Sequence, residues 1–243
     1  MKKTLTPEEK KKFQELFIGA LEEINEMNKI YLGKNESGEN ITLDFEEEGI
    51  NFILLAGKTG SGKGIFDRNL YKQLSENNTS EDIGLIFMDM TQIDFIGWKS
   101  DYLFIPIITK AEEAIKVLHE LAEVRTDKKI FIHIEECDMV CIDREGVESA
   151  LTKLRDHKNI YIIYSTSRLD PSYLNSWMKK FIDLKVVFSV SEENDSKFLL
   201  GNANAYRFKH PGERILSFNN KQIHCQPFTD QEAEILQNFE LTS

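Results

Sequence analysis

The feature that most constrains the fold is an apolar run that leads directly into a glycine-rich loop. Residues 51–64 read NFILLAGKTGSGKG, and the apolar part of this segment, Phe52 to Ala56, has the composition of a strand buried on both faces. The loop is followed by apolar residues at helical spacing: Ile65, Phe66, Leu70, Tyr71 and Leu74. A strand, a glycine-rich turn and a helix in this order predict a nucleotide-phosphate-binding loop, or P-loop.

The chemistry of such a loop assigns roles to its residues. Glycines let backbone amides point at the phosphates, and Lys63 neutralises the charge of the β- and γ-phosphates. The predicted nucleotide-binding set is Gly57, Lys58, Thr59, Gly60, Ser61, Gly62, Lys63, Gly64 and Ile65. Gly64 departs from the pattern, because a serine or threonine that ligates magnesium usually stands there. The expected cofactors are ATP and Mg²⁺.

The rest of the chain alternates between predicted strands and helices. Further buried strands are expected at 83–89, 130–134, 160–166 and 185–190, and helices at 65–76, 110–124, 145–157 and 171–181. Strands that alternate with helices are typical of a mainly parallel sheet flanked by helices. The expected fold class is therefore α/β, with a P-loop core.

The two ends of the chain differ from this core. The segment 1–29 opens with the capping box Thr6-Pro7-Glu8-Glu9 and continues with apolar residues at helical spacing, which predicts an amphipathic helix. A short alternating strand, ITLDF, follows the turn at 34–40. Near the other end, RILSFNNKQIHCQPF predicts a β-hairpin around Asn219-Asn220, and Thr229 caps a final helix. The predicted domains are 1–29, the helix, and 30–243, the ATPase.

Composition excludes several classes of protein. The 243 residues are enough for one globular core, and no run of 18 apolar residues indicates a membrane segment. Three cysteines without CxxC spacing favour neither a disulfide framework nor a zinc site. The net charge of −11 disfavours a protein that coats nucleic acid generally, although a local basic patch is compatible with it. The protein is expected in the cytoplasm.

Polar residues at the ends of two further strands complete the predicted site. IFIHIEECD places Glu135 and Glu136 at a strand end, where a P-loop enzyme needs one carboxylate for the metal and one for the attacking water. By role, Glu135 is the metal-side residue and Glu136 activates the water. Ser165 to Arg168 end another strand, where polar groups are able to contact the γ-phosphate. His133 is expected to be a hydrogen-bonded histidine of the core, and Cys137 and Cys141 are expected to be packing residues.

From about Ile30 to Phe239, the motifs of this chain and their order resemble those of the motor domain of the FtsK/SpoIIIE DNA translocases. GLIFMDMTQIDF followed by IPIIT is similar to the family's IDPK-x-x-EF and PVVT stretches, and IYIIYSTSRLDP to the run ending in ATQRPS. FSVSEENDSKFLLGNANAYRFKHPGERIL resembles the stretch that carries DSR, and QIHCQPFTDQEAEIL resembles the family's terminus. The resemblance implies a RecA-like fold, ATP as substrate and double-stranded DNA as track.

The resemblance also assigns individual residues. Lys63 matches the P-loop lysine, Glu136 the catalytic glutamate and Arg168 the arginine of the QRP segment, whereas Ser167 stands where the glutamine would be. Lys197 replaces the arginine of DSR, which in the family faces a neighbouring subunit's nucleotide; lysine keeps the charge but not the forked geometry. The family's helical insert is almost absent, since only 110–129 separates the two motifs.

These observations favour an FtsK-like ATPase core that works on double-stranded DNA, as a homo-oligomeric ring. Two alternatives remain. One is a nucleotide-binding regulatory or structural subunit with little hydrolysis, which co-assembles with a complete motor and is favoured by Gly64, Ser167 and Lys197. The other is a motor of the type VII secretion kind that moves protein, which would suit the acidic charge.

Overall fold

The computed structural model describes residues 29–140, 143–168 and 176–241. The helix predicted in 1–29 falls almost wholly outside these ranges, as do Cys141 and the first part of the helix predicted at 171–181. The main sheet has seven strands in the order β4-β5-β6-β3-β7-β8-β9. Their bounds are β3 Phe52–Ala56, β4 Ile83–Asp89, β5 Lys129–Glu135, β6 Ile160–Thr166, β7 Leu184–Phe188, β8 Arg214–Phe218 and β9 Lys221–Cys225.

Strands β4, β5, β6, β3 and β7 are parallel, as the sequence predicted. All residues of β3, β4 and β6 are buried, which explains why these segments are apolar without alternation. Strands β8 and β9 extend the sheet as an antiparallel hairpin. Asn219 and Asn220 form its turn with φ values of 46° and 58°, the backbone region that a two-residue type I′ turn needs and that asparagine tolerates. The predicted hairpin is confirmed.

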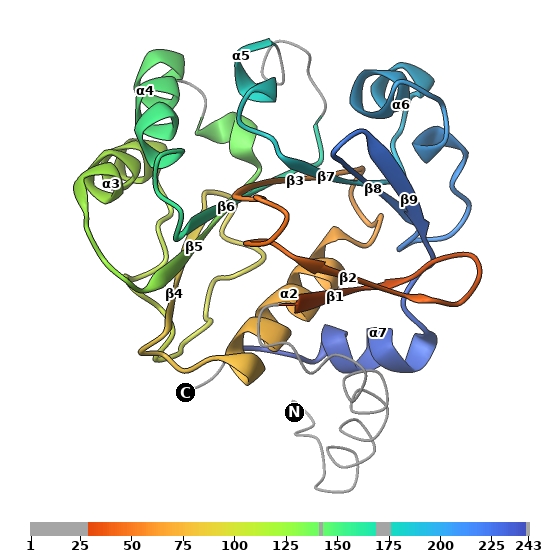
Figure 1. The fold of residues 1–243 in the computed structure, drawn as a ribbon, viewed down its shortest axis with the longest axis horizontal. Coiled ribbons are helices and arrows are strands. Elements are labelled where there is room, and N and C mark those ends of the chain that lie inside the picture. Colours follow the sequence, from red (N-terminus) through yellow and green to blue (C-terminus); the bar gives the residue numbers. More distant parts are fainter. Residues whose placement is uncertain (1–28, 141–142, 169–175, 242–243) are drawn as a thin grey trace, which may run out of the picture.

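Helices cover both faces of the sheet (Figure 1). One face carries α3 Ala111–Glu123, α4 Arg144–Leu154, α5 Ser176–Lys179 and α6 Glu193–Leu200. The other carries α2 Lys63–Asn77, α7 Asp230–Gln237 and a two-stranded sheet of β1 Lys29–Lys34 and β2 Asn40–Asp44. Thr229 caps α7 in a capping box with Glu232, as predicted. Strand β1 and helix α6 were not predicted. None of the described helices is long and apolar enough to cross a membrane.

The β1–β2 hairpin is attached to α2 by polar side chains and, at the end of β1, to the edge of the main sheet, where Gln226 N–H donates to the Lys34 carbonyl at 2.8 Å. Gln73 accepts a hydrogen bond from the backbone N–H of Tyr31 at 2.8 Å, and Asn69 donates one to the Tyr31 carbonyl at 2.8 Å. Both side chains are buried. The backbone groups of Tyr31 on the helix side find their partners in these two amides.

Arg214, at the start of β8, is fully buried and links the hairpin to the main sheet. Its guanidinium donates to the carbonyls of Gly212 at 2.7 Å, Gln226 at 3.1 Å and Leu32, which lies in β1. It also lies over the ring of Phe228, 4.4 Å from the centroid. Gly33, at φ 115°, gives the guanidinium room, since a Cβ there would clash with Nη2.

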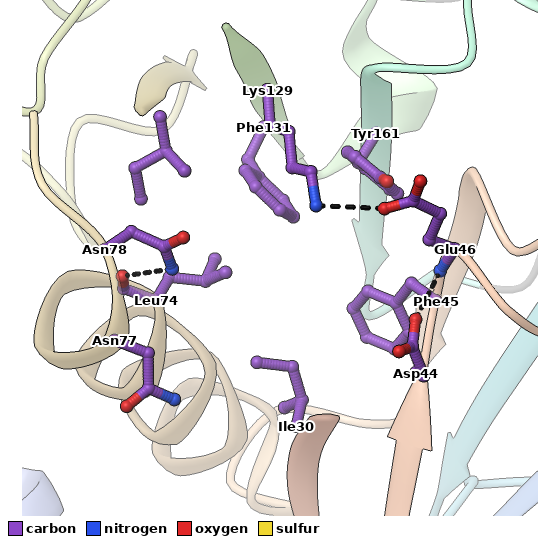
Figure 2. Close-up of a pocket in the computed structure, with 11 residues that line it drawn as sticks. Ile30, Asp44, Phe45, Glu46, Leu74, Asn77, Asn78, Lys129, Phe131 and Tyr161 are labelled. Atoms are coloured by element: carbon purple, nitrogen blue, oxygen red, sulfur yellow. Dashed lines mark hydrogen bonds and ion pairs between the residues drawn. The ribbon is translucent and has the colours of Figure 1, made fainter. Parts of the chain in front are cut away.

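A small cavity of about 30 Å³ lies between the β1–β2 hairpin, α2 and the strands β5 and β6 (Figure 2). Its lining includes Lys129, which starts β5, and the ion pair of Lys129 with Glu46 at 3.0 Å closes one side. The cavity therefore lies toward the amino ends of the parallel strands, whereas the P-loop follows the carboxyl end of β3. It has room for about one water molecule, which is too little for a nucleotide.

Replacing Arg214 with alanine is expected to destabilise the fold by roughly 2–4 kcal/mol, because buried carbonyls that lose their donor cost about 1–3 kcal/mol each and a void is left. For a chain of this size, the expected fall in Tm is on the order of 10 °C. Thermal unfolding followed by circular dichroism measures it. The matched control is Arg207→Ala, an exposed arginine, which should unfold within about 0.5 kcal/mol of the wild type. An unchanged Tm for the Arg214 variant would show that the guanidinium does not hold the hairpin.

Candidate functional site

The P-loop connects β3 to α2 at the carboxyl edge of the parallel strands, and backbone hydrogen bonds hold it there. Gly57 N–H donates to the Thr166 carbonyl at the end of β6, at 3.2 Å. Lys58 N–H donates to the Ser189 carbonyl just beyond β7, at 2.9 Å. The loop is thus fixed to the strands on both sides of β3.

A second loop supports the P-loop from the side of β8. Gly212 N–H donates to the Ser61 carbonyl at 2.7 Å. Gly62 has φ 110°, and a Cβ on it would lie 2.8 Å from the backbone of Gly212. Position 62 therefore requires glycine for two reasons, its left-handed backbone and the close approach of this loop.

Lys63 opens α2, and its side chain turns back over the loop. Its Nζ donates to the Gly57 carbonyl at 2.7 Å, and the side chain is buried. It borders a cavity of about 450 Å³, a size common among small-molecule sites. The lining residues are Thr59, Gly60, Gly62, Lys63, Gly64, Ile65, Asp67, Arg68, Asp94, Glu135, Glu136, Pro211 and Gln237.

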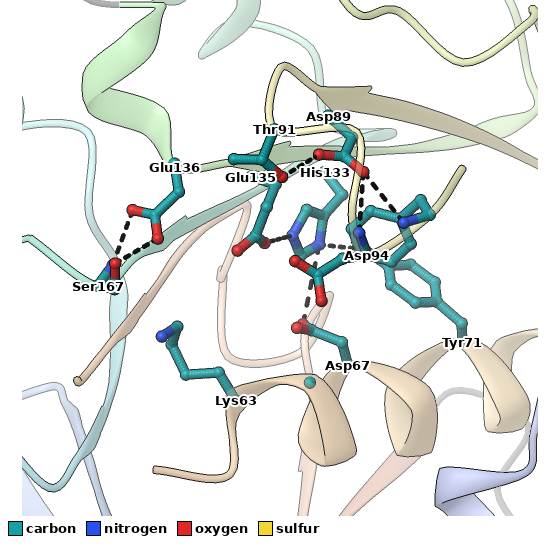
Figure 3. A network of polar contacts seen from close by, with 12 residues as sticks. Lys63, Asp67, Tyr71, Asp89, Thr91, Asp94, His133, Glu135, Glu136 and Ser167 are labelled. Atoms are coloured by element: carbon teal, nitrogen blue, oxygen red, sulfur yellow. Dashed lines mark hydrogen bonds and ion pairs between the residues drawn. The ribbon is translucent and has the colours of Figure 1, made fainter. Parts of the chain in front are cut away.

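Glu136 follows β5 and has a backbone conformation that non-glycine residues seldom adopt, with φ 46° and ψ 64°. This region costs an L-residue roughly 1–2 kcal/mol, so the surrounding structure must hold it in place. Its carboxylate accepts hydrogen bonds from the N–H of Ser167, at 2.9 Å, and from the Ser167 hydroxyl. The end of β6 thus fixes the carboxylate at the rim of the cavity (Figure 3).

Glu135, the last residue of β5, is oriented by a hydrogen bond from His133. The imidazole Nε2–H donates to the Glu135 carboxylate at 2.9 Å, and Nδ1 shares a hydrogen bond of 2.7 Å with the Tyr71 hydroxyl of α2 (Figure 3). His133 is fully buried and hydrogen-bonded, as the sequence analysis expected, but it also adjoins the site. Burial acts to raise the pKa of Glu135, yet the hydrogen bond and charge of His133 bring this pKa below its ordinary value.

Two acidic residues that were not predicted from the sequence lie beside Glu135. Asp67, on α2, is almost fully buried, and burial raises its pKa to about 7, with the charge of Glu135 adding to the rise and that of His133 opposing it. Asp94 follows β4; burial and the charge of Glu135 raise its pKa too. Asp89 places Asp94, because its carboxylate accepts the backbone N–H of Asp94 and Phe95, both at 3.1 Å.

The remaining predicted residues do not border the cavity. Arg168 is exposed just after β6, and its N–H donates to the Thr166 hydroxyl at 3.1 Å. Lys197 lies on α6 and forms an ion pair of 2.6 Å with Glu193. Cys137 is buried in the core, which agrees with the packing role expected for it.

The residues that line the cavity suit a nucleoside triphosphate with a divalent cation. Backbone N–H groups of a glycine-rich loop and Lys63 match phosphate oxygens, and carboxylates such as Glu135 are the ligands that Mg²⁺ prefers. The exception is Gly64, which has no hydroxyl for the cation.

The sequence contained one indication of Asp67, since this residue lies three positions after Gly64 on the same helix. Asp94 carried almost none, since only the fold brings the loop after β4 to the P-loop.

Comparison with known proteins gives relatives in sequence and neighbours in structure. The DNA translocase FtsK of Staphylococcus aureus strain Mu50 is 22% identical over 258 residues, which cover 88% of this chain and 32% of that protein. The pCW3 conjugation coupling protein TcpA, in its monomer form with ATPγS, matches with a TM-score of 0.66 and 17% identity, covering 88% of this chain and 70% of its own.

The cytoplasmic domain of the type VII secretion ATPase EccC from Thermomonospora curvata matches with a TM-score of 0.65 and 15% identity, over 83% of this chain and 28% of that one. No family model matches. The chain spans about a third of the length of the FtsK relative. In sequence and in fold, this chain is therefore a relative of the FtsK-type P-loop ATPase motor domains.

Proposed function

We propose that residues 30–243 form an ATPase core that hydrolyses Mg²⁺-ATP to move double-stranded DNA. The observation that carries this proposal is the cavity in which Lys63 and Glu136 lie on either side of the space above the P-loop (Figure 3). The relationship to DNA translocase FtsK supports DNA as the track. The chain acts in the cytoplasm.

Each residue of the site has a role in phosphoryl transfer to water. When the nucleotide binds, Lys63 exchanges the Gly57 carbonyl for β- and γ-phosphate oxygens, and loop amides between Thr59 and Ile65 receive the phosphates. The amides of Gly57 and Lys58 instead hold the loop in place, because they already donate to Thr166 and Ser189. Glu136 orients the attacking water, and Glu135 is the metal-side carboxylate that would hold Mg²⁺. When bound, Mg²⁺ would supply positive charge that offsets the charge of the phosphates.

Arg168 and Lys197 act from outside the cavity. Lys197 is half-exposed on α6, which suits a cation that reaches the nucleotide of a neighbouring subunit in a homo-oligomeric ring. Arg168 follows Ser167, the residue that positions Glu136, so it can report on the state of the γ-phosphate.

Two other functions are each favoured by a specific observation. Gly64 favours a nucleotide-binding regulatory or structural subunit with little hydrolysis, which joins a complete motor. The likeness to EccC and the net charge of −11 favour a motor that moves protein. Turnover measured with DNA, and with protein partners, separates these functions.

The Lys63→Ala variant is expected to bind ATP at least about 10-fold more weakly, because a charge-assisted hydrogen bond contributes roughly 1.5–3 kcal/mol. Titration of a fluorescent ATP analogue measures the Kd. The control is Lys116→Ala, an exposed lysine on the opposite face, which should bind as the wild type does. Equal affinity for Lys63→Ala and wild type would show that the loop is not a phosphate site.

The Glu136→Gln variant is expected to lower kcat by about 100-fold or more while nucleotide affinity stays within a few-fold, because glutamine keeps the size of the side chain but is no base. ATP turnover is measured with and without linear double-stranded DNA. Wild-type turnover should rise with DNA, and less so at high salt. The control is Glu145→Gln, at an exposed position of α4, which should hydrolyse ATP at the wild-type rate.

Three results would contradict parts of this proposal. Turnover no higher than in Lys63→Ala, with nucleotide still bound, would identify a regulatory subunit. Turnover that ignores DNA but rises with a protein partner would identify a protein motor. Normal turnover in Glu136→Gln would remove Glu136 from the mechanism.

A further inference from the structure

Gly64 leaves the P-loop without its usual ligand for the cation. A serine or threonine after the P-loop lysine ordinarily gives its hydroxyl to Mg²⁺. Here the residue has no side chain, and its carbonyl accepts a hydrogen bond from Arg68 Nη1 at 3.1 Å. If this site uses a divalent cation, as the proposed function requires, another group must take the place of the hydroxyl.

Asp67 has the position and the chemistry to take the place of this hydroxyl. It lies three residues after Gly64 in α2, so the two positions are neighbours on one side of the helix. Asp67 borders the same cavity as Lys63 and Glu135, with only 3% of its surface exposed. Its Oδ1 is buried and accepts no hydrogen bond from any residue that the structure describes. A buried carboxylate oxygen of this kind needs a cation or a donor.

Glu135 faces Asp67 across the cavity at a distance that suits a shared ion (Figure 3). Asp67, His133 and Glu135 each offer an atom, and these atoms lie within 4.8 Å of one another. Two ligand oxygens of one Mg²⁺ ion are roughly 3 to 4 Å apart, which a small side-chain rotation can reach. Carboxylate oxygens are also the ligands that this ion prefers.

His133 is better placed to orient Glu135 than to bind the ion. Both of its ring nitrogens have hydrogen-bond partners, Glu135 at 2.9 Å and Tyr71 at 2.7 Å. The distance from Nδ1 to Asp67 Oδ1 is 3.8 Å, too long for a hydrogen bond. Carboxylates that bind metal ions are themselves usually hydrogen-bonded by neighbouring groups, and His133 gives Glu135 such a bond.

The balance of charge also favours a cation. Asp67, Asp94 and Glu135 border the cavity beside Lys63 and Arg68, and Glu136 adds a fourth carboxylate at the rim. A triphosphate brings several more negative charges into the same space. A divalent ion between the phosphates and these carboxylates would reduce the repulsion between them.

We propose that Asp67 replaces the P-loop hydroxyl as a protein ligand of the nucleotide-bound Mg²⁺, opposite Glu135. This inference rests on the proposed nucleotide site and deepens it. It explains how the chain keeps a cation site with glycine at position 64. It also assigns a function to a buried acid that the resemblance to FtsK-type motors left unassigned.

The test measures binding of Mn²⁺, a spectroscopic substitute for Mg²⁺, to the full chain with ATPγS. Free Mn²⁺ is followed by electron paramagnetic resonance, and ATPγS binding in EDTA is measured separately. The Asp67→Asn variant keeps the size of the side chain but loses its negative charge. It should bind Mn²⁺ at least about 10-fold more weakly, with unchanged ATPγS affinity in EDTA. The control, Asp101→Asn at an exposed position, should match the wild type.

A second substitution provides a rescue. A Cβ added to Gly64 would approach only the tip of the Arg68 side chain, at 3.3 Å, so serine fits there. Gly64→Ser in the Asp67→Asn background should restore most of the lost Mn²⁺ affinity, because it returns the usual hydroxyl. If Asp67 only supported folding, Gly64→Ser would not restore the Mn²⁺ affinity.

Two results would overturn the inference and leave the conclusion that the site binds a nucleotide unchanged. One is equal Mn²⁺ affinity in the wild type and Asp67→Asn. The other is a loss that Gly64→Ser does not restore and that accompanies a lower Tm without metal. If the wild type binds no ATPγS with or without the ion, the proposed function itself fails and the inference fails with it.

Discussion

The backbone hydrogen bonds that hold the P-loop between β6 and β7 are the constraint on which the rest of the site depends. Gly57 and Lys58 donate to Thr166 and Ser189, so the loop takes its position from strands on both sides of β3. The parallel register brings the ends of β5 and β6 to the same edge. Glu136 and Ser167 therefore meet beside the loop, although 31 residues separate them in the chain.

Helix α2 connects this site to the rest of the molecule. Its first turn carries Lys63. Further along, Asp67 and Tyr71 face Glu135 and His133 of β5, and Asn69 and Gln73 hold the β1–β2 hairpin. This explains the unusual number of buried polar residues in α2, which pattern analysis would treat as poor amphipathicity. Each of these side chains has a partner or a cavity to face.

The polar groups behind the carboxylates give the site a defined electrostatic state. His133 keeps the pKa of Glu135 low, whereas burial keeps that of Asp67 near 7. The two acids thus differ in their tendency to ionise although they border one cavity. A bound cation would favour the ionised form of both, which links cation binding to the charge of the pocket.

The sequence alone determined the elements whose signals are local. Apolar runs predicted β3, β4, β5, β6 and β7, Asn219-Asn220 predicted the β8–β9 turn, and Thr229 predicted the start of α7. The P-loop followed from the glycines and Lys63 and from the strand and helix around them. Local backbone preference and burial suffice for these features.

Only the tertiary structure decided which distant residues meet. It placed β1 on α2, buried Arg214 between the hairpin and β8, and gave Glu136 its left-handed backbone. It also brought Asp67, Asp94 and Glu135 to one cavity. The reason is physical: each of these features rests on contacts between segments far apart in the chain, and no local pattern of residues records such a contact.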